Sequence, residues 1–282
     1  MKKKLIILTG PTAVGKTDLS IRLAKTVGGE IISADSMQVY RRMDIGTAKI
    51  RPEEMDGVRH HLIDILEPTE SFNAFLFKEY ALKAANEIWE RGSIPIIVGG
   101  TGFYIQTLLY DVEFAKSDEN DGIRDELNKL YEEHGAAFLH DMLAKADPEY
   151  AAEVHENNVK KVIRAIEFYR QTGHKMSEHN TVQRERTSPY NFEYFVLSDD
   201  RAVLYERIDK RIDKMVEAGL IAEVQALLDE GIDRESVAMQ GLGYKEIAAY
   251  LAGEISLDEA IYILKRDTRH FAKRQLTWFR RE

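Results

Sequence analysis

The sequence contains no cysteine. That absence excludes disulfide bonds, zinc–thiolate sites and a thiol nucleophile, and it fits a reducing compartment. Long apolar runs are missing as well, since none approaches the ~20 residues that a membrane-spanning helix needs. The basic start MKKKLIILTG imitates a signal peptide, but its apolar run is too short and leads into a glycine loop, not into a cleavage site. We therefore expect a cytoplasmic protein with no membrane segment.

The sequence has fewer basic than acidic residues. The 282 residues include 39 Lys and Arg against 48 Asp and Glu, a formal net charge of −9, and an acidic total argues at first against a nucleic-acid partner. The acidic excess is local, however, because it is concentrated between Glu113 and Glu156, whereas 265–282 is rich in Lys and Arg. Charge alone leaves two interpretations of this last stretch open, a basic binding surface or the solvated face of a terminal helix.

Apolar runs and helical patterns alternate along the chain. Buried strands are predicted for the runs at 5–9, 30–35, 61–66, 94–100 and 194–198, with helical spacing between them. Such alternation predicts an α/β fold in which a parallel sheet core has helices on both faces.

One long segment departs from this pattern. Residues 111–190 are polar, helical and poor in strands, so we predict an all-helical insertion domain there, with 1–110 and 191–282 forming the core. A chain of this length by itself suits either one domain with a large insertion or two domains. The C-terminal region is helical up to its last residue without a stop signal, which leaves a longer native chain open.

The strongest local signal is the stretch GPTAVGKT at 10–17. It matches the phosphate-binding pattern G-x-x-x-x-G-K-[ST] between a predicted strand and a predicted helix. Such a P-loop turns backbone N–H groups, a helix N-terminus and a lysine toward an anion, and its threonine can ligate Mg²⁺. We predict a diphosphate site with Thr17 as metal ligand, formed by Gly10, Pro11, Thr12, Ala13, Val14, Gly15, Lys16 and Thr17.

The neighbouring strands argue against an ATP hydrolase. Such an enzyme carries an acid for Mg²⁺ at the end of a nearby strand. The run IPIIVGG ends in glycine, and Asp64 is expected in mid-strand, facing a packed core. A small-molecule kinase can manage without this acid and stays an alternative.

Several polar residues are expected near the loop. Asp35 follows the second predicted strand, at the edge where open α/β sheets bind ligands, and it suits either a general base or a turn cap. Thr101, in GGTGFY, suits either a ligand contact or a helix cap. Arg207 and Arg211 share a helix face, which suits a pyrophosphate clamp or ordinary pairs with the acids of the same helix, Glu206, Asp209 and Asp213.

The motifs together resemble those of the tRNA dimethylallyltransferase family, the tRNA isopentenylpyrophosphate transferases. In chain order they are GPTAVGKT, DSMQVYRRMDIGTAK, GGTGFY, GLGYKE and KRQLTWFR. The resemblance implies that the loop holds dimethylallyl diphosphate and that its dimethylallyl group passes to N6 of the adenine 3′ to the anticodon, position 37 of tRNA. It implies pyrophosphate release with Mg²⁺ as cofactor, and the tRNA anticodon stem-loop as partner. Without any interface signal, we expect a monomer.

The chemistry agrees with this resemblance. An allylic C–O bond breaks, so a diphosphate cradle stabilises the charge that builds on the leaving group. A carboxylate can take the proton of the attacking amine. The resemblance implies the catalytic set Asp35, Thr101, Lys16, Arg207 and Arg211.

Contacts to tRNA are implied by matching positions. The target adenine is normally stacked and must be extruded into a pocket. The implied contacts are Asp35, Ser36, Met37, Gln38, Thr101, Arg124, Lys160, Lys161, Arg164, Gln240, Gly241, Leu242, Gly243, Tyr244, Lys245, Lys273, Arg274, Gln275, Trp278 and Arg280. Lys160 and Lys161 depart from the Gln and Arg that are common in the family, and core packing is the plainer interpretation of Trp278.

Two further alternatives stay open at this point. A related adenylate isopentenyltransferase would use a free adenine nucleotide as acceptor, whereas the helical insertion and the basic C-terminal stretch favour a macromolecule. An RNA-binding module without catalysis is the other alternative. The presence of Lys16, Thr17, Asp35 and Thr101 argues against it.

Overall fold

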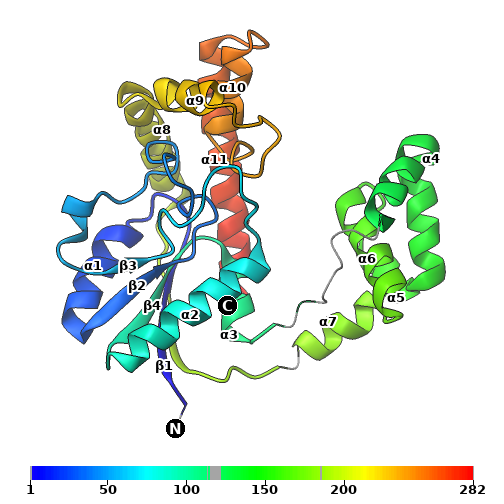
Figure 1. Cartoon of the computed structure of the whole chain (residues 1–282), viewed down its shortest axis with the longest axis horizontal. Helices are drawn as coiled ribbons and strands as arrows, with labels where there is room; N and C mark the ends of the chain where they lie inside the picture. The colour runs from blue at the N-terminus through cyan, green and yellow to red at the C-terminus, as the bar shows by residue number, and fades with distance from the viewer. Residues whose placement is uncertain (1, 113, 115–121, 185, 282) are drawn as a thin grey trace. The chain divides into compact units, whose positions relative to one another are not determined.

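In a computed structural model, the chain forms two compact units (Figure 1). The structure describes residues 2–112, 114, 122–184 and 186–281, so part of the acidic segment that begins at Glu113 lies outside the described residues. The first unit, here called the core, comprises Met1–Leu109 and Pro189–Glu282. The second, here called the insertion, comprises Tyr110–Ser188.

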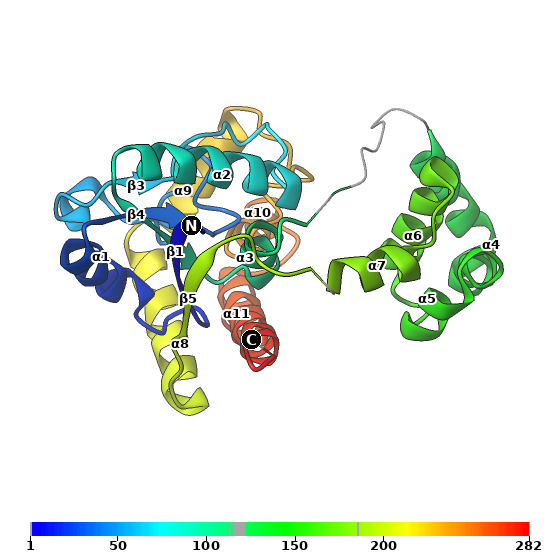
Figure 2. The same ribbon diagram turned by 90° about the horizontal axis from the view of Figure 1, so that it is seen from below.

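Within the described part of the chain, the sheet of the core has five parallel strands in the order β3-β2-β4-β1-β5. The strands are β1 (Lys4–Thr9), β2 (Gly29–Ser33), β3 (His60–His61), β4 (Ile94–Gly99) and β5 (Asn191–Val196). Helices α1 (Lys16–Val27) and α2 (Ala74–Glu90) both pack on β2 and β4, one on each face (Figure 2). Strands buried on both faces require apolar runs, and the α/β prediction is confirmed. The edge strand β5 is an exception: Phe195 and Val196 are 48% and 38% exposed, so the burial predicted for the run at 194–198 was wrong.

The third strand is much shorter than the strand predicted for 61–66. β3 covers only His60–His61. Leu62 and Asp64 then adopt left-handed conformations, with φ of 63° and 54°, which interrupt an extended strand. The expectation for Asp64 was therefore wrong: its half-exposed carboxylate binds Lys49 Nζ at 2.5 Å instead of facing a packed core.

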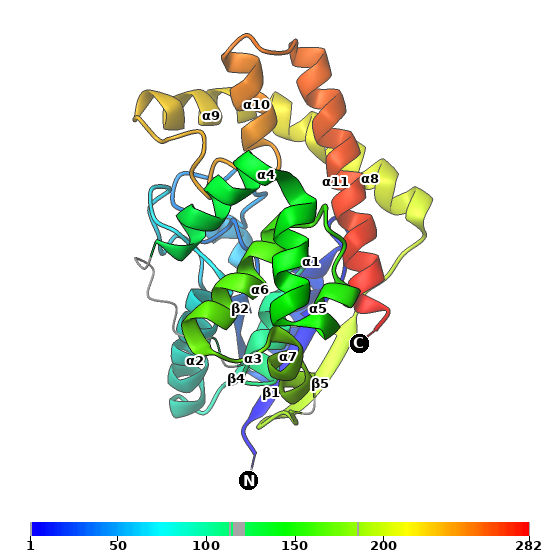
Figure 3. The same ribbon diagram turned by 90° about the vertical axis from the view of Figure 1, so that its right-hand side faces the viewer.

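The remaining helices of the core lie mostly after the fifth strand. They are η1 (Pro52–Met55), α3 (Gly102–Leu109), α8 (Arg201–Glu217), α9 (Leu220–Asp229), α10 (Tyr244–Leu251) and α11 (Leu257–Phe279). The long α11 packs on α8, α10 and α3. Helices α9 and α10 lie beyond the carboxyl ends of the strands (Figure 3), so they can close a site at that edge of the sheet.

Among its described residues, the insertion has helices and connecting segments but no strand. It consists of α4 (Ile123–Ala146), α5 (Pro148–Glu153), α6 (Val159–Thr172) and α7 (Met176–Arg184). It has a hydrophobic core of its own, which includes Leu127, Leu139, Leu143, Val162 and Ile166. Across the described residues of the whole chain, no helix combines the length and the apolar character needed to cross a membrane.

Candidate active site

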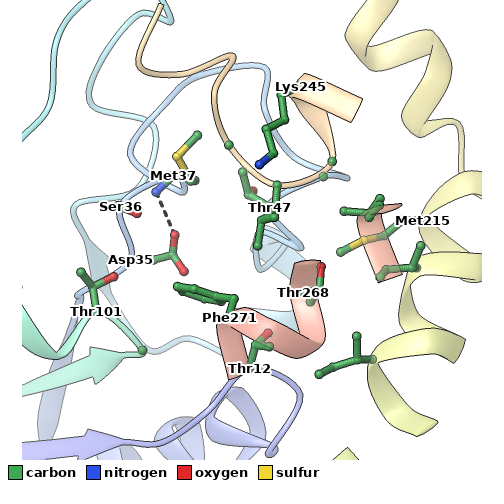
Figure 4. A pocket seen from close by; sticks show the side chains of 18 of the residues that line it. Thr12, Asp35, Ser36, Met37, Thr47, Thr101, Met215, Lys245, Thr268 and Phe271 are labelled. Carbon is green, nitrogen blue, oxygen red and sulfur yellow. Dashed lines mark hydrogen bonds between the residues drawn. The ribbon is translucent and has the colours of Figure 1, made fainter. Parts of the chain in front are cut away.

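A cavity of about 360 Å³ opens in the core at the carboxyl edge of the sheet. Its lining comes from the glycine loop, from the turns after β2 and β4, from α8 and α11, and from the segment before α10 (Figure 4). The side chains of Asp35 and Thr101 lie on one side and Met215 lies on the other, while Phe271 lies near Asp35 and Thr12. The cavity therefore suits a ligand with one charged and one apolar end.

The glycine loop leaves β1 in a strained path that only small residues follow easily. Gly10 and Gly15 have φ of 144° and 92°, and a Cβ added to Gly10 would lie 2.4 Å from the carbonyl oxygen of Leu197. Lys16 begins α1, and its Nζ donates to the carbonyl oxygens of Gly10 and Pro11 at 2.9 and 2.8 Å. The sequence pattern thus gives a tight turn that ends in a lysine.

Burial lowers the pKa of Lys16 from its ordinary value to about 8. The negative charge of Asp35 opposes this shift, and the positive charge of Arg211 adds to it. Thr17, the predicted metal ligand, is exposed at the start of α1. In the part of the chain that the structure describes, no cluster of three or more His, Asp or Glu side chains is suited to a metal ion.

Asp35 caps its own turn and faces the cavity as well. Its Oδ1 accepts hydrogen bonds from the backbone N–H groups of Met37 and Gln38 at 2.8 and 3.3 Å (Figure 4). Its Oδ2 accepts none from the described residues. The two interpretations that the sequence left open are therefore compatible, because one oxygen orients the side chain and the other is available to a ligand.

Thr101 lies close to Asp35 because the ends of β2 and β4 meet. A Cβ added to Gly99 would lie 2.3 Å from the carbonyl oxygen of Ala34, so this contact requires glycine. The backbone of Thr101 also accepts the N–H groups of Tyr104 and Ile105 at the start of α3. The Thr101 hydroxyl makes no hydrogen bond with another described residue, and it lines the cavity (Figure 4).

The two arginines of α8 have different surroundings. Arg207 is exposed and pairs with Asp199 at 2.9 Å, and it is not among the residues that line the cavity. Arg211 lines the cavity, and burial lowers its pKa although the charge of Asp35 opposes this. The acids of α8 pair with other cations, Glu206 with Lys210, Asp209 with Arg269 and Asp213 with Lys265. Arg211 thus has no carboxylate partner among the described residues.

The wall opposite the sheet is held by one carboxylate. Glu223 of α9 accepts the backbone N–H groups of Asp44, Ile45 and Gly46 at 2.9, 2.7 and 3.0 Å. It also accepts the hydroxyl of Tyr244 at 2.6 Å. Burial and the neighbouring Glu223 raise the pKa of Tyr244. This carboxylate joins the segment after β2 to the first residue of α10, and the segments after β2 and before α10 line the cavity.

Most of the residues implied around the start of α10 reach the cavity. Gln240, Gly241, Leu242, Gly243 and Lys245 line it, whereas Tyr244 is fully buried behind the wall. Ser36 and Met37 line it too, but the Gln38 amide turns away from it and donates to the carbonyl oxygen of Thr47 at 3.3 Å. Gln38 therefore supports the wall instead of facing a ligand.

The basic residues of α11 divide between two sites. Arg274 and Gln275 line the main cavity. Lys273, Arg274 and Trp278 border a second groove, together with His270, Thr277 and Arg281. Trp278 packs against Gly102 and lies edge to face with Phe103, at 6.4 Å between ring centroids. Arg280 is exposed and lines neither hollow.

The implied residues of the insertion lie on its helices. Arg124 pairs with Glu167 at 3.0 Å. Lys160, Lys161 and Arg164 are exposed on α6, and no ion pair links them to another described residue. Their spacing places three positive charges on one helix surface.

The apolar half of the cavity was not identified from the sequence. Its residues include Ile208, Ile212 and Met215 from α8, with Leu264 and Phe271 from α11. Their helical spacing is the same as that of ordinary core residues, so no local signal marks them. The neighbouring residue Thr47, in contrast, belongs to the motif DSMQVYRRMDIGTAK and could have been found there.

Fold and cavity define a class of protein: an α/β enzyme whose glycine loop and parallel sheet edge meet a partly apolar pocket. A family model described as IPP transferase matches residues 38–282. A tRNA dimethylallyltransferase from Lachnoclostridium phytofermentans is 61% identical over 278 residues, which are 99% of this chain and 89% of the relative. One from Carboxydothermus hydrogenoformans is 54% identical over 100% of this chain and 90% of the relative.

Solved structures agree with these relatives. The tRNA isopentenylpyrophosphate transferase of Bacillus halodurans is 49% identical, with a TM-score of 0.73 over 100% of this chain and 88% of its own. A eukaryotic dimethylallyltransferase described as acting on tRNA is 34% identical, with a TM-score of 0.86 over 98% of this chain and 69% of its own. The chain therefore belongs to the IPP transferase family, and the resemblance seen in the sequence is confirmed.

Proposed function

We propose that this protein is a tRNA dimethylallyltransferase, which moves the dimethylallyl group of dimethylallyl diphosphate onto N6 of adenine 37 of tRNA and releases pyrophosphate. Membership of the IPP transferase family supports this activity. The structural observation that carries it is the cavity, whose lining combines Asp35, apolar side chains and Arg211, which has no carboxylate partner in the described part of the chain. A diphosphate joined to a short branched hydrocarbon has the same division into a charged and an apolar end.

The diphosphate end belongs at the glycine loop. Backbone N–H groups of the loop, Lys16 and Arg211 supply positive charge where negative charge builds up on the leaving oxygen. The bond from C1 of the allyl group to the bridging oxygen breaks, and its electron pair leaves with pyrophosphate. The Thr101 hydroxyl is placed to donate a hydrogen bond to that oxygen.

The acceptor end belongs at Asp35. The lone pair of the adenine N6 attacks C1 of the allyl group, and the proton that N6 loses passes to Oδ2 of Asp35. Oδ1 is held by the N–H groups of Met37 and Gln38, which fixes the direction of Oδ2. Phe271, near Asp35, and Met215 supply apolar lining, against which the dimethylallyl group avoids water.

Mg²⁺ fits this arrangement with few protein ligands. Thr17 is exposed beside Lys16, and magnesium commonly keeps several waters and binds through substrate phosphates. When bound, the ion neutralises charge on the diphosphate. The proposal also includes a monomer in the cytoplasm that recognises the anticodon stem-loop, with the exposed cations of α6 on the RNA side.

A transfer assay tests the proposal. The protein is incubated with Mg²⁺, radiolabelled dimethylallyl diphosphate and either unmodified tRNA or AMP, and the labelled product is identified. We expect label at the adenine beside the tRNA anticodon. Label on AMP alone would assign the protein to the adenylate isopentenyltransferases. ATP consumption with no label on either acceptor would favour a kinase and contradict the proposal.

A further inference from the structure

Gln275 of α11 joins two loops of the cavity. Its Oε1 accepts the backbone N–H of Thr12 at 2.8 Å, and its Nε2 donates to the carbonyl oxygen of Gly100 at 2.9 Å. Only 6% of Gln275 is exposed. An amide with both ends bonded to backbone, and almost no exposed surface, is poorly placed to bind an RNA backbone.

The two loops carry the two halves of the proposed chemistry. Thr12 lies in the glycine loop after β1, which faces the diphosphate. Gly100 directly precedes Thr101, after β4, and β1 and β4 are neighbours in the sheet. A Cβ added to Gly100 would lie 2.2 Å from Nε2 of Gln275. Glycine at position 100 therefore leaves the space that the Gln275 amide, which reaches the turn from α11, occupies.

We propose that Gln275 is a positioning residue, which sets the spacing between the diphosphate loop and the Thr101 turn so that leaving group and acceptor meet at reacting distance. This inference rests on the proposed function. It changes the role that the family resemblance implied for Gln275, from a contact with tRNA to a link inside the catalytic core. Errors of about 1 Å in such spacing can lower rates about 100-fold.

Glutamate is the most informative replacement. An ionised carboxylate still accepts the N–H of Thr12, but it places a second acceptor against the carbonyl oxygen of Gly100 and a negative charge beside the diphosphate site. A protonated carboxyl group donates to Gly100 and accepts from Thr12, as the amide does. The variant Gln275→Glu should therefore act as an amide mimic only when it carries a proton.

The measurement is single-turnover transfer by Gln275→Glu and wild type, each from about pH 6 to about pH 8.5, with tRNA affinity measured in parallel. Burial raises the pKa of the introduced carboxyl group, and above that pKa its protonated fraction falls about tenfold per pH unit. We expect a rate about 100-fold below wild type at about pH 8, and a variant-to-wild-type ratio that rises at least about tenfold toward pH 6. Affinity for tRNA should stay within about twofold.

The variant-to-wild-type rate ratio separates the titration of the introduced carboxyl group from that of neighbouring groups. Asp35 and Arg211 in the cavity lining, Arg274 beside Gln275 on α11 and Lys16 at the start of α1 also face this region, and the wild-type profile contains their effects. Gln225→Glu is the matched control, because its amide lies on the exposed face of α9 and donates to Asp229. It adds the same charge and should change neither the rate nor the ratio.

Two results would overturn the inference. One is a loss of tRNA affinity with an unchanged single-turnover rate, which would return Gln275 to RNA contact. The other is a pH-independent ratio in a variant with a normal circular dichroism spectrum. If wild type itself transfers no label, the proposed function fails first, so the two failures are distinguishable.

A second pair of variants tests the inference if Gln275→Glu does not fold. Gly100→Ala adds a methyl group where the amide lies, so it should lower the rate at unchanged tRNA affinity. The double variant Gly100→Ala with Gln275→Ala should have a transfer rate little below that of the slower single variant, because both changes remove the same link. Additive losses in this cycle would contradict the proposal.

Discussion

Lys16 and Arg211 are two partly buried cations, Arg211 in the lining of the cavity and Lys16 at the start of α1. Within the described residues, neither lies within salt-bridge distance of a carboxylate, and burial lowers the pKa of both. An unpaired buried charge destabilises a fold. An anion that enters the cavity removes this cost, so the two residues favour a doubly charged ligand over water.

The lowered pKa of Lys16 predicts a pH dependence for donor use. Below about pH 8 the ammonium is charged and attracts the diphosphate, and above it the charge is lost. We expect kcat/KM for dimethylallyl diphosphate to fall as pH rises through about 8, approaching tenfold per unit. Lys16→Arg should remove this decline, because arginine stays charged. Lys25→Arg, on the exposed side of α1, is the control and should retain it.

Asp35→Asn separates the two roles of this side chain. The asparagine oxygen can still accept the N–H groups of Met37 and Gln38, so the turn is kept while the base is lost. We expect the single-turnover rate to fall by about 10²–10⁴ with tRNA affinity nearly unchanged. Asp233→Asn is the matched control, because Asp233 caps an exposed turn through the N–H of Glu235. A rate within a few fold of wild type would exclude Asp35 as the base.

At the scale of elements, the segment after β2 depends on groups that are distant in sequence. Lys49 is buried, and its Nζ lies 2.6 Å from Asp44, 2.5 Å from Asp64 and 2.7 Å from the carbonyl oxygen of Tyr40. Glu223 binds the same segment from α9. An irregular segment held in this way can present Gly46 and Thr47 to the cavity in one conformation.

Glu223→Gln should loosen this wall. The amide replaces one acceptor oxygen by an NH₂ group that faces backbone donors, which leaves N–H groups unsatisfied. We expect the free energy of unfolding to fall by about 1–3 kcal/mol, measured by denaturant titration. Tyr244→Phe removes one of the four hydrogen bonds and should cost less. Glu254→Gln, in an exposed pair with Arg234, should leave the melting temperature unchanged; equal losses in all three would contradict this role for Glu223.

The same elements show what the sequence could predict. Asp35 and Thr101 were placed correctly at the sheet edge, because each directly follows a clear apolar run. The short β3 was missed because Lys49 holds Asp64 in a non-extended turn. Arg207 and Arg211 could not be told apart, since Asp209 and Asp213 are taken up by Arg269 and Lys265 of α11, which the pattern of α8 alone does not show. The sequence pattern places Gln275 on a helix, but the two loops that it joins come close to it only in the tertiary structure.

At the scale of the whole molecule, the chain divides into two units with separate hydrophobic cores. The core of the insertion is formed by its own helices, including Leu139, Val162 and Ile166. Asp147 adds a buried polar link, since its carboxylate accepts Tyr150 N–H at 3.1 Å and the Ser177 hydroxyl at 2.7 Å. Every residue lining the cavity belongs to the other unit. The insertion can therefore be removed without removing a cavity residue.

Replacing residues 110–188 by a short Gly/Ser linker should separate donor binding from RNA binding. The shortened core retains the glycine loop, Arg211 and the apolar wall, so we expect it to fold and to bind dimethylallyl diphosphate within a few fold of wild type by calorimetry. It loses the exposed cations of α6, so its affinity for tRNA should fall about 100-fold or more. Residues 110–188 expressed alone should give a helical circular dichroism spectrum and a cooperative melt. The full chain with Lys160→Glu and Lys161→Glu should repeat much of the affinity loss, whereas Lys145→Glu on α4 should not. A folded shortened core that binds tRNA as tightly as wild type would show that the insertion has another role.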